Sequence, residues 1–576
     1  MEKRLLVAIL LSFLVLYGYQ VLVQKPAMEK AKREAPAAAA GSAAAPAGTA
    51  GSGAPAALSA APAAPVVLAA PLVADREERD IVVETQAVRA VFTNRGARLK
   101  SWQLKTYRDL QKKPQELVAT YMPDYRARPF DLKVDDAAAN AALKLALFKA
   151  SADDSGRLNV AGRAETLTFE YKDASGLSAR KAFTFEPAGF VVGVEVDVEA
   201  GGKPLNPTVL WGLGLGDQIP GTASSSYTQK AEGIIVRGDK VQRLAPSELD
   251  RQPVQEGNVT AAGVDTQYFI ALALPSRTLR TEYWRGDMPA PASADPKDPA
   301  PKDPAQLVGF GVRQAQSMSN VKFFVGPKDF DVLQAVDGRL VRVINFGIFD
   351  FLAVPLLRAL KWIHGYVTNY GWAIIILTFI INAVMFPLRH KSMVSMRKMQ
   401  EIQPLVKAIQ DRYAGMKATD PAKQKMNSEM MSLYKEKGVN PVSGCIPMLL
   451  TMPVLFAFYS LLSQAIEIRG EPFIWWITDL SAHDKFYVTP ILMGASQFWQ
   501  QKMTPMTGGD PVQQKMMMMM PLVFTFMFLW MPSGLTVYWF FSNLLAIGQQ
   551  YLTNHLVGPP NVPRPPAERK LKTTPA

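Results

Sequence analysis

The feature that most limits the fold of this chain is an uncharged stretch near its C-terminus, because no charged residue occurs from Met516 to Asn554. A helix that crosses about 30 Å of hydrocarbon needs about 20 apolar residues, so this stretch is long enough for two membrane-spanning helices. Segment 530–534, with the sequence WMPSG, contains the Pro and Gly of a tight turn and a Trp that suits the membrane boundary. The sequence therefore predicts two spans that meet at this turn.

Other uncharged runs extend the pattern along the chain. They lie at residues 5–23, 371–388, 442–466 and 486–501. Together these runs predict five spans after an N-terminal one, six in all, with both termini on the same side of the membrane.

The short loops predict the orientation of these spans. Loop 389–438 contains eleven Lys and Arg against five Asp and Glu, whereas loop 467–485 contains two against four. Because positive charge is retained in the cytoplasm, we expect the first loop and both termini to be cytoplasmic and the second loop to be external.

The two ends of the chain have compositions of their own. Residues 1–25 are expected to be an uncleaved signal-anchor helix, with a cleavable signal peptide as the alternative. Residues 26–75 are rich in Ala and Pro and poor in large apolar side chains, which predicts a disordered linker. Residues 556–576 form a basic cytoplasmic tail, which we interpret as a positive-inside signal rather than a contact to ribosomal RNA.

Residues 76–340 have the pattern of a soluble domain rich in strands. Apolar and polar side chains alternate in residues 80–93, 166–171, 181–198 and 321–325, and Asn94-Arg95-Gly96 is a typical turn. We expect a large antiparallel all-β sandwich, on the external side of the membrane, which in a double-membraned bacterium is the periplasm.

Sequence signals for catalysis or metal binding are weak. Glu195 and Asp197 would share one face of a strand, which we interpret as a solvated face rather than a catalytic pair. Segment 286–305 repeats DPKDP and APKDP and is expected to be an exposed loop. The single cysteine, Cys445, excludes an internal disulfide and a cysteine-rich zinc site, and the four dispersed histidines do not favour a histidine site. No metal, cofactor or DNA partner is expected.

Residues 345–366 predict a helix that lies in the membrane interface. Asp350, Arg358, Lys361 and His364 occur there among leucines and aromatic residues at helical spacing. We interpret His364 as an interfacial polar tip rather than a ligand.

The cytoplasmic loop 389–438 predicts a two-helix hairpin. Asp420-Pro421 is a typical helix start, and Gly438 is a typical helix end. Methionines recur in this segment at Met393, Met396, Met399 and Met430. Packing between the two helices is the favoured interpretation, and adaptable binding of apolar segments of another protein is the alternative.

Polar side chains recur within the predicted spans, where each is costly unless it faces protein or water. They are Thr378, Asn382 and, beyond them, Arg389 in the second span; Thr451 in the third; Thr489, Ser496, Gln497, Gln500 and Gln501 in the fourth; and Trp539, Ser542, Asn543 and Gln550 in the sixth. These residues predict the lining of a hydrated cavity, and interhelical hydrogen bonds are the alternative.

Three strings carry a family resemblance. They are NPVSGCIPMLLTMPVLFAFY at residues 440–459, EPFIWWITDLSAHDKFYVTPILMGASQFWQQKM at 471–503, and FLWMPSGLTVYWFFSNLLAIGQQ at 528–550. Residues 345–555 thereby resemble the YidC/Oxa/Alb membrane-protein insertases. The N-terminal span, linker and large domain resemble the Gram-negative bacterial form of this family, in which that domain is a β-supersandwich. The resemblance implies a multi-domain membrane protein, with a core of five transmembrane helices and the cytoplasmic hairpin at residues 367–555.

The resemblance also implies a function. It is that of an insertase and chaperone of the bacterial inner membrane, not an enzyme, which acts alone or with the Sec translocon through a hydrophilic groove. The implied partners are nascent membrane proteins, the lipid bilayer and the Sec translocon, and the ribosome stays open. Carried over by position, Thr378, Thr451, Tyr538 and Trp539 fall at groove or slide sites. The full expected groove set is Thr378, Asn382, Arg389, Thr451, Gln497, Gln501, Tyr538, Trp539 and Asn543, and the four methionines named above are expected to contact client proteins.

Three positions depart from the family pattern. Many members have Arg where this chain has Asn382, Gln where it has Thr451, and a second Tyr where it has Trp539. A neutral Asn382 is expected to weaken the capture of acidic client tails. Arg389 lies about 10.5 Å further along an ideal helix, and we expect it to meet acidic tails at the mouth of the groove.

Other classes of membrane protein fit less well. A transporter is expected to have repeated halves and buried ions, which five unequal spans do not show. An intramembrane protease needs a nucleophile beside its base, yet Ser533 and His555 lie at opposite ends of one predicted span. A structural membrane receptor stays open as an alternative.

Overall fold

The computed structural model describes residues 69–558 except 110, 121, 124, 154, 217–230, 276–277, 289–304, 315–317, 414–420, 440–445 and 504–510. The chain divides into two compact units, Met1–Pro65 and Val66–Ala576, and every described residue belongs to the second. The predicted N-terminal span, and most of the predicted linker and tail, therefore lie outside the described residues.

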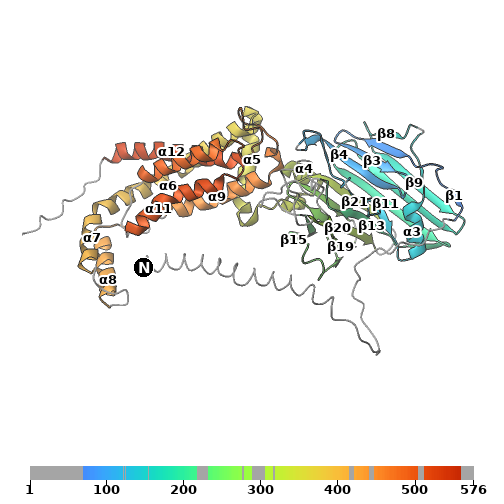
Figure 1. Ribbon diagram of the computed structural model, residues 1–576, viewed down its shortest axis with the longest axis horizontal. Helices are drawn as coiled ribbons and strands as arrows, with labels where there is room; N and C mark the ends of the chain where they lie inside the picture. Colours follow the sequence, from blue (N-terminus) through green and yellow to red (C-terminus); the bar gives the residue numbers. More distant parts are fainter. Residues whose placement is uncertain are drawn as a thin grey trace, which may run out of the picture. The chain divides into compact units, whose positions relative to one another are not determined.

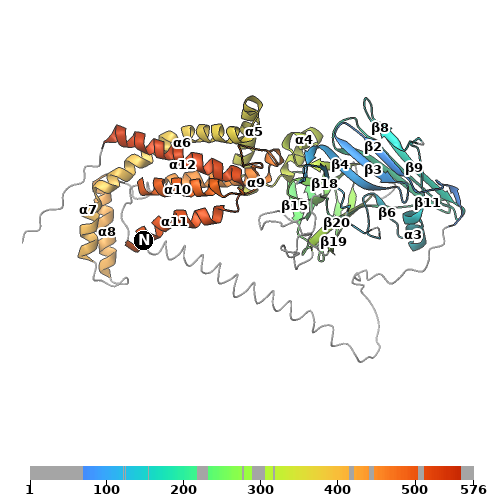
Figure 2. The same ribbon diagram turned by 45° about the horizontal axis from the view of Figure 1, so that its top comes forward.

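The first half of the described unit consists of three sheets, whose strands pair antiparallel except for β2 with β8. The largest sheet has the order β1 (Pro71–Val73), β9 (Glu165–Asp173), β10 (Leu177–Phe185), β11 (Val191–Ala200), β21 (Met318–Pro327), β18 (Phe269–Leu274), β17 (Ala261–Asp265), β14 (Glu232–Arg237) and β15 (Lys240–Leu244), with β12 (Lys203–Leu205) beside β11 and β7 (Lys149–Ala150) beside β9. The second has the order β16 (Val254–Gly257), β19 (Leu279–Met288), β20 (Ala305–Gln314), β13 (Thr208–Leu213) and β6 (Asp131–Lys133). The third has the order β5 (Pro114–Glu116), β4 (Arg98–Arg108), β3 (Val88–Thr93), β2 (Asp80–Glu84) and β8 (Arg157–Asn159), of which β2, β3 and β4 lie side by side in Figure 2. A short helix, α3 (Ala137–Leu145), precedes β7.

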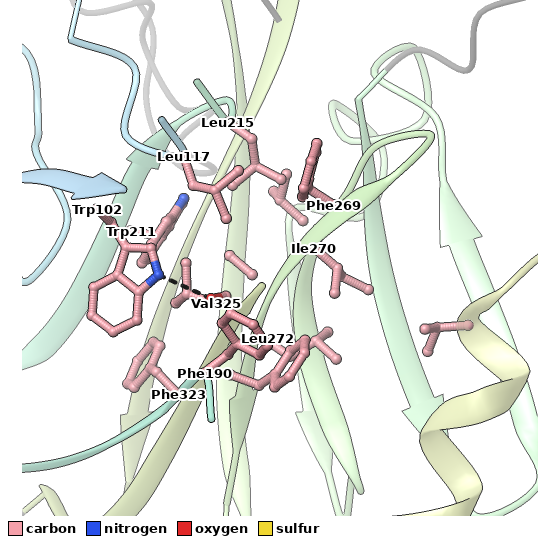
Figure 3. Close-up of a cluster of buried hydrophobic side chains, with 14 of the residues drawn as sticks. Trp102, Leu117, Phe190, Trp211, Leu215, Phe269, Ile270, Leu272, Phe323 and Val325 are labelled. Atoms are coloured by element: carbon pink, nitrogen blue, oxygen red, sulfur yellow. Dashed lines mark hydrogen bonds between the residues drawn. The ribbon is translucent and has the colours of Figure 1, made fainter. Parts of the chain in front are cut away.

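Side chains from different sheets meet in an aromatic core, as the predicted sandwich requires. The ring of Phe92 on β3 lies 4.8 Å from that of Phe183 on β10, between centroids. The indole Nε1 of Trp102 on β4 donates a hydrogen bond to the Val325 carbonyl of β21 at 3.0 Å (Figure 3). These contacts join the third sheet to the first, so the expected all-β sandwich is confirmed.

The local strand predictions were too coarse in two places. Segments 80–93 and 181–198 each read as continuous alternation, but each contains a hairpin: β2 with β3, and β10 with β11. In the first, the Thr85 hydroxyl accepts hydrogen bonds from the amides of Ala87 and Val88. Across this turn the buried positions change from odd numbers, Ile81 and Val83, to even numbers, Val88, Ala90 and Phe92. Most of the predicted loop 286–305 lies outside the described residues.

The remaining elements are helical. They are α4 (Phe330–Val336), η2 (Gly338–Val343), η3 (Gly347–Phe349), α5 (Asp350–Val367), α6 (Tyr370–Glu401), α7 (Gln403–Arg412), α8 (Pro421–Glu436), α9 (Ile446–Gln464), η5 (Ile466–Ile468), α10 (Val488–Met503), α11 (Pro511–Phe528) and α12 (Ser533–Val557). The break between α11 and α12 falls at the predicted turn, and α6 and α12 run side by side (Figure 1). Hydrogen bonds described below join α6 and α10 to α12.

The predicted cytoplasmic hairpin has a different first arm from the one expected. Helix α6 continues through Pro387 to Glu401 without a break, and only then does α7 begin. Helices α7 and α8 form the antiparallel pair that Figures 1 and 2 show. The hydroxyl of Tyr413 donates to Glu429 at 2.8 Å between them.

Among the described residues, α6 is the one helix that is both long and apolar enough to cross a membrane, judged by length and composition alone. Residues Met518–Phe528 of α11 are apolar but shorter. Six spans and their orientation therefore stay predictions.

Candidate functional site

The polar side chains of α6 form a connected set of hydrogen bonds. The hydroxyl of Thr378, which is fully buried, donates to the Ile374 carbonyl at 2.6 Å. Asn382 Nδ2 donates to the Thr378 carbonyl at 2.8 Å and, at the long distance of 3.5 Å, to the Ser542 hydroxyl of α12. Asn382 Oδ1 accepts a hydrogen bond from Arg389 Nη1 at 2.6 Å. We call Thr378, Asn382, Arg389 and Ser542 the α6 polar face.

The side chain of Arg389 therefore folds back along α6 towards Asn382. Although seven residues separate the two backbones, the guanidinium of Arg389 reaches the amide of Asn382. The Arg389 side chain is partly buried. A guanidinium has five N–H donors, and the partner of Nη1 here is a neutral amide. A full positive charge thus lies at the level where the sequence indicated only a neutral amide.

Two neighbouring aromatic residues of α12 face different helices. Tyr538 is buried and stacks on Phe458 of α9 at 4.2 Å between ring centroids. It also lies within electrostatic reach of Arg389. Trp539 packs instead against Phe528 of α11 at 4.7 Å. Of these two expected groove or slide residues, Tyr538 adjoins the α6 polar face and Trp539 lines the contact with α11.

A second group of expected groove residues joins α10 to α12. Three hydrogen-bonded pairs recur at intervals of seven residues: Thr536 to Thr489 at 2.9 Å, Asn543 to the Ser496 hydroxyl at 3.1 Å, and Gln550 to the Met503 carbonyl at 2.8 Å. We call these pairs the α10–α12 ladder. Its bonds agree with the alternative interpretation of interhelical hydrogen bonding. Asn543 belongs to this ladder and not to the α6 polar face.

Thr536 was not among the polar positions expected from the sequence, although Thr489, Ser496, Asn543 and Gln550 were. The available signal was spacing, because Thr536 lies seven residues before Asn543 and so falls on the same helical face. Gln549 was not expected either, and its Nε2 donates a hydrogen bond to the Phe386 carbonyl of α6 at 3.1 Å.

The other predicted groove residues lie on α9 and α10. Thr451 on α9 and Gln501 on α10 are partly buried. Gln497 on α10 has a buried Oε1 without a hydrogen-bond partner among the described residues. A buried acceptor of this kind is costly, so this part of α10 has unused hydrogen-bonding capacity.

The hairpin methionines divide into two pairs. Met399 and Met430 pack against the buried cluster of Ile402, Val406 and Val439. Met393 and Met396 on α6 are partly buried and do not belong to that cluster. Helix packing thus accounts for Met399 and Met430, and the other two keep client binding as their predicted role.

Two further kinds of site were considered from the sequence, a metal site and a catalytic carboxylate pair. Among the described residues, no group of three or more His, Cys, Asp or Glu could hold a metal ion. Glu195 and Asp197 are both exposed on β11, on the solvated face that the sequence indicated.

Comparisons with known proteins cover both halves of the chain. Residues 80–359 match the family model described as "YidC periplasmic domain", and residues 362–559 match "60Kd inner membrane protein". The chain is 36% identical over 564 residues to "Membrane protein insertase YidC" of Syntrophus aciditrophicus (strain SB), covering 96% of this chain and 99% of the relative. It is 37% identical over 562 residues to the protein of the same name from Citrifermentans bemidjiense, covering 97% and 100%. Among solved structures it resembles "Active YidC insertase crystal structure with the first transmembrane domain resolved", at 18% identity and a TM-score of 0.34 over 84% of this chain and 94% of that one.

Proposed function

The chain belongs to the YidC family of membrane protein insertases, and we propose that it passes the acidic flanking segments of its clients along the α6 polar face. The family models describe an inner membrane protein with a periplasmic domain, so this chain is an inner-membrane insertase whose residues 80–359 form that domain. The clients are nascent membrane proteins, and the proposed path begins on the cytoplasmic side of the bundle.

The observation that carries this proposal is the contact between Arg389 and Asn382. A charge inside a membrane bundle is costly unless a partner offsets it, and the partner here is a neutral amide. A carboxylate would form a charge-assisted hydrogen bond with the guanidinium, which is about twice as strong as a neutral one. The arriving client carboxylate would therefore displace the Asn382 amide from Arg389.

The proposed orientation follows from the loop charges. Loop 389–438 is proposed to be cytoplasmic because it carries the excess of Lys and Arg, and both termini would lie on the same side. Met393 and Met396, which hairpin packing does not account for, are the proposed first contacts for an apolar client segment. The Sec translocon is the proposed partner for larger clients. The ribosome is a further proposed partner, because loop 389–438 is positively charged. No cofactor or catalytic step is required.

The test compares two clients in vesicles that contain the purified full chain. The clients share one membrane-spanning segment and differ only in whether the translocated tail is acidic or neutral. Loss of a charge-assisted bond worth about 1.5 to 3 kcal/mol predicts that Arg389→Gln slows the acidic-tail client about tenfold or more. The neutral-tail client should change less than about twofold.

A matched control lies two residues further along the same helix. Lys391 is exposed, so Lys391→Gln removes the same charge without touching the polar face and should leave both rates unchanged. Asn382→Leu should slow both clients because it removes hydrogen bonding from the face, whereas Asn382→Ala should be milder because water can replace the amide. Equal slowing of both clients by Arg389→Gln would remove the proposed capture role.

A further inference from the structure

The loop between α9 and α10 presents large aromatic side chains to its surroundings. Trp475 is 88% exposed and Phe486 is 67% exposed. The backbone of Trp475 has φ +42°, in the left-handed region that bulky residues rarely adopt. Such strain persists only where the surrounding structure holds it, so the position of Trp475 is enforced rather than accidental.

Asp484 is the residue that fixes this arrangement. Its buried carboxylate accepts hydrogen bonds from Trp476 Nε1 at 3.3 Å and from the amide of Phe486 at 3.0 Å. It also accepts the amide and the hydroxyl of Thr489, in the first turn of α10, at 2.8 and 2.9 Å. Asp484 thereby links Trp476, the neighbour of Trp475, to the first turn of α10. Phe486 lies two residues before that helix begins.

A second set of bonds joins the loop to the start of α12. The amides of Ser533 and Gly534 donate to the carbonyls of Ala482 and Leu480 at 2.7 and 2.9 Å. A Cβ at Gly534 would meet the Leu480 carbonyl oxygen at 3.2 Å, so glycine permits this close approach. The loop is therefore hydrogen-bonded to the first turns of both α10 and α12.

The acidic and basic side chains of the loop differ in their exposure. Its four carboxylates, Glu467, Glu471, Asp479 and Asp484, are all partly or fully buried. Lys485, beside Phe486, is exposed. The outward surface of the loop thus combines Trp475, Phe486 and one cation, with no exposed acid in residues 465–487.

We propose that Trp475 and Phe486 insert into the headgroup region of the outer leaflet and anchor the loop to the lipid surface. The inference rests on the membrane placement of α10 and α12 in the proposed function, because it assigns the loop to the level where these helices leave the bilayer. Trp and Phe supply the apolar area, and the indole N–H remains able to bond to headgroups. Lys485 adds attraction for anionic lipid. Other aromatic residues of α5 and of the start of α6 are also exposed, namely Trp362, Tyr366 and Trp372. They extend the same kind of surface.

The test places a nitroxide on position 475 of the full chain. The natural cysteine is removed by Cys445→Ser, and Trp475→Cys is labelled and reconstituted in vesicles of phosphatidylethanolamine and phosphatidylglycerol. Collision rates with oxygen, which prefers lipid, and with a water-soluble nickel complex then report depth. Two reference labels accompany it: Ile380→Cys, on an exposed part of α6, and Leu72→Cys, on an exposed strand of the β domain.

The expected result is a depth between the two references, with more oxygen collision and less nickel collision at 475 than at 72. Accessibility at 475 equal to that at 72 would overturn the anchor while leaving the insertase proposal intact, provided that the label at 380 lies in lipid. Exclusion of both reagents at 475 would also overturn it, because protein would then cover the loop. A water-exposed label at 380 would contradict the membrane placement itself, and both proposals with it.

Discussion

Lys181 lies wholly inside the β domain, and its ammonium group holds three backbone carbonyls. Its Nζ donates to Gly96, Ala97 and Phe130 at 2.6, 3.0 and 2.8 Å. All three acceptors have positive φ, so the lysine stabilises two turns in strained backbone conformations. The alternation of β10 does place residue 181 on the buried face. Composition argues the other way, because lysine is almost never buried without partners, and partners distant in sequence could not be identified from the sequence.

Lys181→Met is predicted to lower the free energy of unfolding of the β domain by about 2 to 4 kcal/mol. The apolar side chain fits the volume but leaves buried carbonyls without donors, at about 1 to 3 kcal/mol for each unsatisfied group before relaxation. Denaturant unfolding of the full chain, followed by tryptophan fluorescence, measures the change. Lys322→Met, at an exposed position of β21, is the control and should change stability by less than about 0.5 kcal/mol. A similarly small change for Lys181→Met would show that the three bonds contribute little.

The side-chain conformation of Arg389 could not be predicted from the sequence. Spacing along an ideal helix gave the distance between its backbone and that of Asn382, but it could not give the rotamer. The structure shows that a long, flexible side chain closes this distance and bonds to the amide. Thr378, Asn382 and Ser542 were marked as polar positions within the predicted spans, because polarity is visible in the sequence. Which helix each one faces was not.

At the scale of elements, the α10–α12 ladder separates helix packing from the proposed client path. Asn543→Leu is predicted to destabilise the bundle by about 0.5 to 1.7 kcal/mol, the range found for hydrogen bonds between membrane helices. The preference for acidic over neutral tails should not change, because Asn543 bonds to α10 and not to the α6 polar face. Unfolding in mixed micelles and the two-client assay measure these quantities separately. A loss of tail preference in Asn543→Leu would place the ladder in the client path.

Lys361 of α5 joins elements that precede and follow it in the chain. Its Nζ lies 2.7 Å from Asp331 and 3.7 Å from Asp329, at the start of α4, and 3.3 Å from Glu467 of η5. Burial, and then the charge of Asp329, raise the pKa of Glu467, whereas Lys361 opposes the rise. The positive charge of Lys361 therefore reduces the electrostatic repulsion among Asp329, Asp331 and Glu467 at neutral pH.

Lys361→Met should consequently destabilise the protein in a pH-dependent way. A carboxyl whose pKa is raised in the folded state is most compatible with folding when it is protonated, and this contribution is lost as the pH rises through the folded pKa. We expect a deficit of about 1 to 3 kcal/mol at pH 8, reduced from the cost of breaking a fully buried pair because Lys361 is 22% exposed. The deficit should shrink as the pH falls towards about 4 to 5. Thermal unfolding across this range, with the exposed Lys240→Met as control, checks it. A deficit independent of pH would exclude the electrostatic cause.

The elements themselves were predictable to different degrees. The turn between α11 and α12 and the existence of the hairpin followed from Pro, Gly and charge, which act locally. The continuation of α6 to Glu401 did not, because Pro387 and the change to polar residues both suggested a boundary. The hairpins β2–β3 and β10–β11 were also missed, although in each the buried positions change from odd to even numbers at the turn.

At the scale of the whole molecule, the β domain contacts the helical part at defined points. Arg469 donates to Gln115 at 2.9 Å, and Gln267 donates to the Ser463 carbonyl at 2.7 Å. Both helical partners lie near the C-terminal end of α9, whereas the α6 polar face and the hairpin consist entirely of residues after 370. The β domain therefore supplies no side chain to the proposed client path.

Deleting residues 76–327, up to the end of β21, is accordingly predicted to leave most insertion activity. The stability of the remaining helical part should fall, because its contacts with Gln115 and Gln267 are lost. The truncated chain is first tested for stable embedding by its protease-resistant core and is then assayed with the neutral-tail client. Loss of insertion by a truncated chain that is still stably embedded would assign the β domain a direct role.

The most direct measurement of the central claim uses vesicles that contain only this chain. A radiolabelled single-span client is added from outside, and external protease then reports whether its translocated tail has become protected. We predict a protected fragment of the size of span plus tail with the full chain, and none with empty vesicles. For an acidic tail, the fragment should form about tenfold more slowly with Arg389→Gln. If the client stays fully protease-sensitive with the full chain, although the chain itself is embedded, the account is contradicted.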